Sequence, residues 1–268
     1  MAAVTLHRAA CVHGQIAWRE AGHGTPLLLL HGIGSGSGSW AGQFEGLAHS
    51  YRVLAWDAPG YGDSDPLTVA RPLGGDYASA LTGLLAASQV EGPVIVVGHS
   101  LGAIVAAAWA AQQRQRVGAL VLASPARGYR SASAEVRDSK YRERIELVER
   151  LGIAGMAAER SAALCAPGAS GAALEAVRSH MARATPGGYA QAAWMLAHDD
   201  LLAYLKDAPV PRAVLCGELD RTTPPAACEQ VARDCGAPFV PLRGVAHACY
   251  VEDPAQFNAA LLACLNTR

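Results

Sequence analysis

Short runs of mainly apolar residues recur along the chain, at residues 27–30, 51–56, 93–97, 117–123, 212–216 and 239–242. Runs of this length with little polar interruption are typical of strands buried on both faces of a parallel sheet. Segments of helical character separate most of them, at residues 40–50, 75–89, 103–110, 226–235 and 254–265. Ahead of these runs, residues 4–8 and 15–19 flank Gly14 as the strands of a hairpin do. The pattern predicts an α/β fold, with a mostly parallel central sheet flanked by helices.

The strand and helix alternation is interrupted between residues 126 and 205. This stretch offers no convincing strand, and its pattern predicts helices at residues 134–151, 154–165, 172–183 and 189–205. Glycine and proline separate these helices. We therefore predict an all-helical cap at residues 126–205, inserted into a core formed by residues 1–125 and 206–268.

The run at residues 93–97 leads into Gly-His-Ser-Leu-Gly at residues 98–102. These residues fit G-x-S-x-G, in which a serine occupies a sharp turn between a strand and a helix. Glycines at both ends leave room for the close approach of neighbouring chain, and the helix N-terminus favours developing negative charge. We predict that Ser100 is a nucleophile. The alternative is an ordinary loop between two buried elements.

A second glycine-rich segment, which begins His31-Gly32-Ile33, follows the run at residues 27–30. It lacks the Gly-Lys-Ser/Thr ending of a phosphate-binding loop. We predict instead that the backbone N–H of Ile33 converges with that of Leu101 to form an oxyanion hole, and that His31 shapes this loop. A flexible glycine loop is the alternative.

A serine hydroxyl needs a base to take its proton and an acid to orient that base. Asp220 and His247 each lie just past the end of a predicted strand, and parallel strands end at the same edge of the sheet as Ser100. The predicted triad is Ser100, His247 and Asp220, with Glu218 as a weaker alternative acid. His99 is expected to point away from the nucleophile.

Composition narrows the classes of partner. The 268 residues include 22 Lys and Arg against 23 Asp and Glu, for a formal net charge of −1. This balance gives no reason to expect nucleic acid or an anionic membrane as a partner. The N-terminus has no signal-like pattern, and no apolar stretch is long enough to span a bilayer. We expect a cytoplasmic monomer or homodimer acting on a small molecule.

The residues that commonly bind metals do not form a recognisable pattern. Seven cysteines are scattered without CxxC spacing, which argues against a zinc site or a disulfide framework. The acidic turn at residues 57–65 contains three aspartates but does not match a calcium-binding loop. Its carboxylates are expected to bond backbone N–H groups. We expect neither a metal nor a cofactor.

Taken together, the motifs resemble those of the α/β-hydrolase superfamily, and specifically its small cap-bearing serine esterase or lactonase members. They stand in the expected order, at residues 31–32, 57–64, 98–102, 217–225 and 244–247. The resemblance implies an α/β-hydrolase fold with Ser100 as nucleophile, His247 as general base and acid, and Asp220 as the orienting carboxylate. It implies hydrolysis of an ester or lactone through an acyl-enzyme.

Alternatives from the same superfamily remain open. Enol-lactone hydrolases of aromatic degradation are similar in length and cap size. Enzymes that cleave carbon–carbon bonds in ring-fission products often carry Gly-Asn-Ser-Met-Gly-Gly at the elbow and a tryptophan after the histidine, where this chain has Gly-His-Ser-Leu-Gly-Ala and Tyr250. Some proteins of this fold are ligand receptors that do not turn over a substrate. Turnover of a generic ester separates the two classes.

The substrate pocket is predicted to lie between core and cap, with Trp40, Trp194 and Tyr250 in a mainly apolar lining. This lining leads us to expect an uncharged or weakly polar acyl group. A carboxylate-bearing substrate needs a cationic partner, and Arg127 and Arg130 are the nearest candidates in the sequence.

Overall fold

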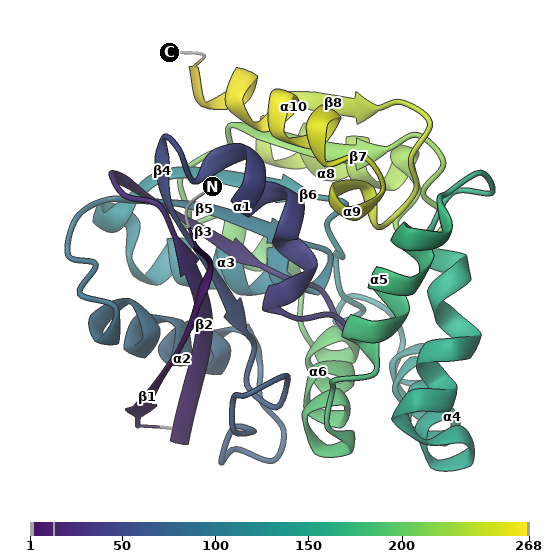
Figure 1. Cartoon of the computed structure of the whole chain (residues 1–268). Helices are drawn as coiled ribbons and strands as arrows, with labels where there is room; N and C mark the ends of the chain where they lie inside the picture. Colours follow the sequence, from purple (N-terminus) through teal and green to yellow (C-terminus); the bar gives the residue numbers. More distant parts are fainter. Residues whose placement is uncertain (1–2, 13, 267–268) are drawn as a thin grey trace.

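The computed structural model describes residues 3–12 and 14–266. Its eight strands form one sheet in the order β1-β2-β4-β3-β5-β6-β7-β8 (Figure 1). Strands β1 and β2 pair antiparallel, as do β2 and β4, and every other pair is parallel. The prediction of a mostly parallel sheet with an N-terminal hairpin is therefore confirmed. The strands are β1 (Thr5–Cys11), β2 (Gly14–Ala21), β3 (Thr25–Leu30), β4 (Tyr51–Asp57), β5 (Val94–His99), β6 (Val117–Ala123), β7 (Ala213–Gly217) and β8 (Phe239–Leu242).

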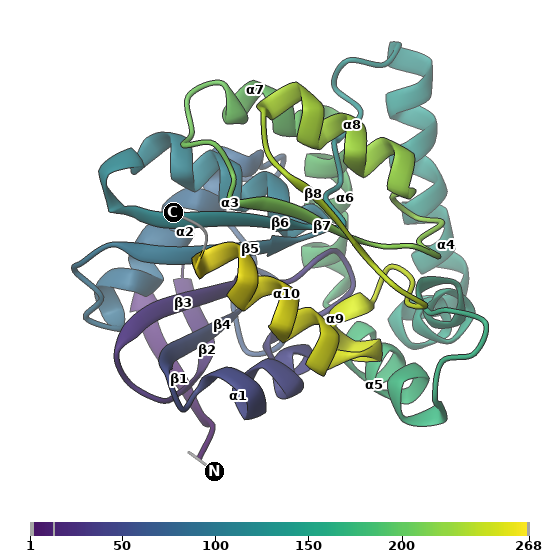
Figure 2. The same cartoon turned by 90° about the horizontal axis from the view of Figure 1, so that it is seen from above.

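Helices cover both faces of the sheet (Figure 2). One face carries α2 (Gly74–Ala87), α3 (Leu101–Gln112), α7 (Leu201–Leu205) and α8 (Pro225–Cys235). The other carries α1 (Ala41–Leu47), α9 (Cys249–Glu252) and α10 (Pro254–Asn266). Short 3-10 turns occur at Ser37–Trp40, Arg114–Arg116 and Ser161–Leu164. No helix in the described part of the chain is long and apolar enough to cross a membrane.

The apolar runs divide their side chains between two cores. Leu27 and Leu29 of β3 pack with α1 and α10, whereas Leu28 and Leu30 pack with α2 and α3. All four side chains are 0% exposed. Successive side chains of a strand point to opposite faces, so an unbroken apolar run is what a strand covered on both sides requires.

We call residues 126–205 the insertion; they lie between β6 and β7. Three helices, α4 (Ala134–Arg160), α5 (Gly171–Met181) and α6 (Pro186–His198), lie beyond the end of the sheet (Figure 1), and α7 follows them. The break predicted at Gly152 is present as a kink, with a non-helical φ of 66° inside α4. Whether the insertion is a separate domain stays a prediction.

One long helix was expected at residues 189–205, and two are observed. Two aspartates end the first and begin the second. Asp199 is buried and accepts the N–H of Gly74, at the start of α2, at 2.6 Å. The next residue, Asp200, caps α7 by accepting the N–H of Leu202 at 3.0 Å. Helical periodicity alone does not reveal these tertiary and capping bonds.

The insertion meets the core through backbone as well as side chains. A Cβ added to Gly188 of α6 would lie 2.2 Å from the carbonyl oxygen of Gly60, and one added to Gly60 would lie 2.3 Å from Gly188 Cα. Only glycine allows this approach at either position. Thr185 strengthens the contact, because its hydroxyl and its N–H both donate to Gly60 O, at 2.9 and 3.1 Å.

Candidate active site

Ser100 stands at the turn between β5 and α3. Its φ of 52° and ψ of −119° lie outside the regions that non-glycine residues favour. Backbone bonds hold this conformation: Ser100 N–H donates to Ala123 O at 2.9 Å, and Ala126 N–H donates to Ser100 O at 3.1 Å. The expected role of the flanking glycines is confirmed. A Cβ at Gly98 would lie 2.5 Å from Gly102 O.

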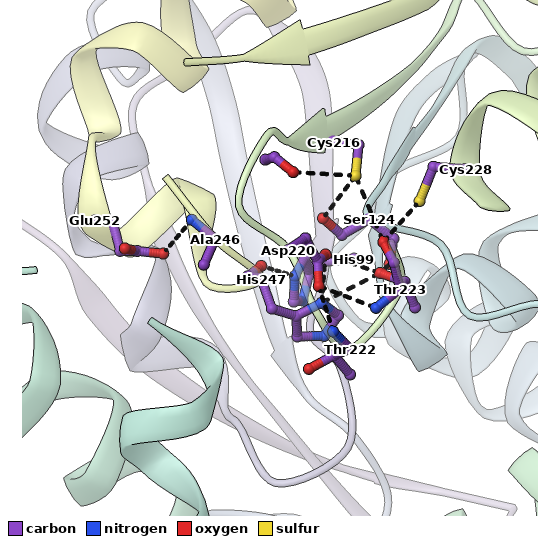
Figure 3. Close-up of polar contacts among 11 residues, drawn as sticks. His99, Ser124, Cys216, Asp220, Thr222, Thr223, Cys228, Ala246, His247 and Glu252 are labelled. Atoms are coloured by element: carbon purple, nitrogen blue, oxygen red, sulfur yellow. Dashed lines mark hydrogen bonds and ion pairs between the residues drawn. The ribbon is translucent and has the colours of Figure 1, made fainter. Parts of the chain in front are cut away.

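Two other members of the predicted triad are in direct contact (Figure 3). His247 Nδ1 lies 2.8 Å from Asp220 Oδ2, and the side chains are 6% and 0% exposed. Each residue follows a strand, β8 for His247 and β7 for Asp220. Since both strands end at the same edge of the sheet, residues far apart in sequence meet there.

The Asp220 carboxylate is fixed by its own turn. Its Oδ1 accepts the N–H groups of Thr222 and Thr223 at 2.8 and 2.9 Å. Burial alone would raise the pKa of Asp220, but the hydrogen bond and charge of His247 and the Thr223 N–H outweigh burial and hold the pKa at about 2. The carboxylate is therefore ionised and able to orient a neutral imidazole or stabilise an imidazolium.

Ser100 and His247 line the same cavity, which has a volume of about 400 Å³. Among the described contacts, no hydrogen bond joins Ser100 Oγ to His247. Such bonds are often long in free enzymes and tighten when substrate binds. In the described part of the chain, no group of three or more His, Cys, Asp or Glu side chains is placed to hold a metal ion.

The two predicted oxyanion donors come from separate segments, the elbow and the loop after β3. Leu101 opens α3, where a helix leaves its first N–H groups without partners, and Ile33 lines the cavity. Within the described residues, no backbone hydrogen bond engages either N–H. Both residues also line a second, smaller hollow beside the cavity.

His31 helps to set the direction in which the Ile33 N–H points. Its Nε2 accepts the N–H of Ala58 at 3.0 Å, so the proton of the neutral ring is on Nδ1, which donates to Gly32 O at 2.8 Å. Burial lowers the pKa of His31 and favours this neutral ring. The carbonyl of Gly32 and the N–H of Ile33 belong to one planar trans peptide and point in opposite directions. By holding the carbonyl, His31 orients the N–H.

His99 was expected to point away from the nucleophile, yet its ring lies against His247 (Figure 3). The ring centroids are 4.8 Å apart, and His99 Nε2 donates to the backbone carbonyl of His247 at 2.8 Å. Burial, together with the nearby His247, lowers the pKa of His99 to about 3. Its Nδ1 is buried without a hydrogen-bond partner. The signal in the sequence for a position near the site is that His99 directly precedes Ser100.

Two further residues, which the sequence pattern did not single out, support the pair. Thr223 Oγ1 lies 2.9 Å from Asp220 Oδ2 and 3.2 Å from His247 Nδ1. Aspartate followed by hydroxyl residues two and three positions later is a signal for such a turn. Glu252 accepts the N–H of Ala246 at 2.9 Å and that of Ala166 at 2.7 Å, which ties the loop before His247 to the insertion.

Of the predicted pocket residues, the structure places Tyr250 in the cavity lining but not Trp40 or Trp194. Trp40 is completely buried beneath Tyr250, with ring centroids 3.9 Å apart. Trp194 stacks on His198 at 3.6 Å and lies outside the lining. Of the two candidate arginines, Arg127 lines the cavity and Arg130 does not.

The acidic turn after β4 bonds backbone groups, as expected from its aspartates. Asp57 Oδ1 accepts the N–H of Ser37 at 2.8 Å, and Asp57 Oδ2 accepts that of Asp63 at 3.2 Å. Asp65 accepts the N–H of Gln15 at 2.8 Å. The turn thereby joins the loop after β3 to the hairpin.

Comparison with known proteins gives curated relatives for part of the chain. An uncharacterized protein of Mycobacterium tuberculosis is 41% identical over 114 residues, which cover 42% of this chain and 33% of that protein. A 2-hydroxy-6-oxo-6-phenylhexa-2,4-dienoate hydrolase of Comamonas testosteroni is 32% identical over 114 residues, covering 41% of this chain and 40% of that enzyme. The matched segments span less than half the length of these relatives.

Similarity to solved structures and to the family extends over most of the chain. A thermophilic esterase from Thermogutta terrifontis matches with a TM-score of 0.85 and 27% identity, covering 98% of this chain and 100% of the esterase. The model of the alpha/beta hydrolase family matches residues 27–260. The chain belongs to the alpha/beta hydrolase family.

Proposed function

We propose that this hydrolase is serine-dependent and cleaves a carboxylic ester or lactone of a small, largely apolar molecule through an acyl-enzyme. The observation that carries the proposal is the buried His247–Asp220 pair, 2.8 Å apart, whose histidine lines the same cavity as the strained Ser100. A nucleophile, a base and an orienting acid at one cavity form the set that acyl transfer requires.

In the proposed reaction, Ser100 Oγ bonds to the carbonyl carbon while its proton passes to His247 Nε2, since Nδ1 faces Asp220. The N–H groups of Ile33 and Leu101 stabilise the oxyanion. The C–O bond to the alcohol then breaks, and the leaving oxygen takes the proton from His247. Water, deprotonated by His247, attacks the acyl-enzyme, and Ser100 regains its proton as the acid leaves.

We further propose that the insertion is the lid over this site. Leu164, Val177 and Met181 of the insertion line the same cavity as Ser100 and supply apolar surface for the body of the substrate. A lid of this kind excludes water from the reacting atoms and selects the substrate.

A second candidate is hydrolysis of a carbon–carbon bond in a ring-fission product. It is favoured by the 32% identity to the 2-hydroxy-6-oxo-6-phenylhexa-2,4-dienoate hydrolase over 41% of this chain. This reaction would use the same serine, histidine and oxyanion donors. A side-by-side assay of an aryl ester and a ring-fission product distinguishes the two by kcat/KM.

The test of serine dependence is Ser100→Ala. We expect turnover of a 4-nitrophenyl ester to fall by roughly 10⁴-fold or more, because the attacking oxygen is lost. A fluorophosphonate probe should label Ser100 in the parent protein. Ser79→Ala is the matched control, since Ser79 is exposed on α2 and bonds the carbonyl of Gly75. Activity that survives Ser100→Ala, or a parent protein that never turns over an ester, contradicts the proposal.

A further inference from the structure

Charge is segregated in the candidate cavity. Its lining includes Arg127, Arg144 and Arg160 but no aspartate, glutamate or lysine. The chain as a whole has nearly equal numbers, with 22 Lys and Arg and 23 Asp and Glu. All three arginines belong to the insertion, whereas the candidate catalytic residues belong to the core.

These guanidinium groups retain much of their hydrogen-bonding capacity. Arg144 donates to Lys140 O, on its own helix, at 2.7 Å. Arg127 Nε lies 4.0 Å from Asp200 Oδ1, beyond hydrogen-bonding distance. Among the described residues, no hydrogen bond or ion pair engages the guanidinium of Arg160. A guanidinium has five N–H donors in a rigid fork, so all three side chains can still bind an anion.

Some arginines of the insertion that lie outside the cavity have carboxylate partners. Three of them form ion pairs with carboxylates, namely Arg150 with Glu159, Arg178 with Glu175 and Arg183 with Asp63. Arg127 also has a carboxylate neighbour, Asp200, but among the described residues Arg144 and Arg160 form no ion pair, and no carboxylate lines the cavity. Like charges that share a cavity repel one another until an anion enters.

We propose that the substrate carries a carboxylate, which Arg144 and Arg160 bind with Arg127 beside them, while its ester or lactone group faces Ser100. This inference rests on the proposed function and changes its expected substrate from a neutral molecule to an acid. Guanidinium and carboxylate match as planar, bidentate partners. A cationic cavity also concentrates anions near its mouth. The apolar wall from Leu164, Val177 and Met181 holds the carbon chain between the two ends.

The test compares two substrates of the same chain length, mono-4-nitrophenyl adipate and its methyl ester. They share the scissile bond and differ in one negative charge. We expect the parent protein to prefer the acid by about 10-fold in kcat/KM, the value of one charge-assisted hydrogen bond. Added salt should reduce this preference, since it screens partly exposed charges. Equal rates for the two substrates, at low and at high salt, would overturn the proposal.

Substitutions of single arginines test which side chains cause the preference for the acid. Arg144→Gln and Arg160→Gln should each lower kcat/KM for the acid by about 10-fold, mainly through KM, and change the methyl ester by less than about 3-fold. Arg142→Gln removes the same charge from an exposed position on α4 outside the lining, and should leave both rates within about 3-fold. Equal losses on both substrates, with circular dichroism unchanged, would also overturn it.

A binding measurement separates this inference from the proposed function. If neither substrate is turned over, the proposed function fails, but adipate itself can still be titrated by calorimetry into the Ser100→Ala protein. Binding at low salt that weakens by about 10-fold with Arg144→Gln supports the cationic subsite. No binding of adipate, or binding that Arg144→Gln leaves unchanged, rejects it.

Discussion

The core and the insertion contribute two different kinds of polar wall to one cavity. On the core side, the His247 and Asp220 side chains are 6% and 0% exposed; His99 bonds the backbone carbonyl of His247, and the Asp220 carboxylate is held by its own turn. On the insertion side, the Arg127 side chain is 49% exposed, and Arg160 has no partner among the described residues. One wall fixes geometry, and the other presents charge.

The difference matches the roles that we propose for the two walls. Proton transfer and oxyanion binding need donors held to within a fraction of an ångström, which buried loops at the end of a sheet supply. Selection of a charged substrate tolerates flexible, long side chains, because attraction acts over several ångströms. Changes in the core wall should therefore alter kcat for every substrate, and changes in the insertion wall should alter KM for some.

Apart from Ser100→Ala, the largest effect is expected from Asp220→Asn. The variant loses the charge that stabilises the imidazolium, and its amide accepts the Nδ1–H less well. We expect kcat to fall by roughly 10² to 10⁴-fold, equally for the neutral and the acidic substrate. Stopped-flow or steady-state kinetics on both substrates measure this.

Glu218→Gln is the matched control for Asp220→Asn, because it removes a carboxylate from an exposed position in the same turn. It should retain nearly full activity. A large loss of kcat in Glu218→Gln together with a small loss in Asp220→Asn would mean that Glu218, and not Asp220, is the orienting acid.

A smaller effect is expected from His31→Gln. The substitution loosens the Gly32 carbonyl and with it the direction of the Ile33 N–H. Loss of an oxyanion donor costs roughly 10² to 10³-fold in kcat, and misdirection of one should cost about 10-fold or more. KM should barely change, while a boronic acid that mimics the tetrahedral state should bind more weakly. A change in KM alone would assign His31 to the substrate wall instead.

The smallest effect is expected from His99→Gln, on the stability of the folded chain at acid pH. The pKa of His99 is about 3 in the folded chain against an ordinary 6.5. Between these values the unfolded chain binds a proton that the folded chain does not, so the free energy of unfolding falls as pH decreases. His99→Gln should flatten this decline, measured by urea unfolding between about pH 7 and about pH 4.5. An unchanged slope would show that His99 is protonated in the folded chain.

Much of the core was predictable because its signals are local. The run at residues 117–123 is predicted and observed as a strand with the same bounds. The elbow is similarly local: G-x-S-x-G between an apolar run and a helix sets the turn at Ser100. The proximity of Asp220 and His247 could be predicted because parallel strands end at the same edge of the sheet. That these three residues act together in catalysis stays a prediction.

The pocket was less predictable because it depends on how separate helices pack. Arg144 belongs to the run of charges at residues 137–150, which resembles an ordinary solvated helix face, and Arg160 is the last residue of α4. Only the position of α4 brings both residues to the cavity lining. Trp194 is of a residue type that often lines binding pockets, yet in α6 its ring packs against His198 and Arg71. Residue type suggests what a side chain can bind, but tertiary packing decides whether it faces the site.

The contact between Gly60 and Gly188 has a consequence for how this protein diversifies. It joins core and insertion through backbone atoms, with no side chain between them. The side chains along α4 and α5 are therefore free to change without loss of this anchor. Under the proposed lid role, changes along the insertion wall alter the choice of substrate while the two glycines remain fixed as a pair. We expect homologues that keep this anchor to differ readily in substrate preference, and Gly60 and Gly188 to be retained or lost together.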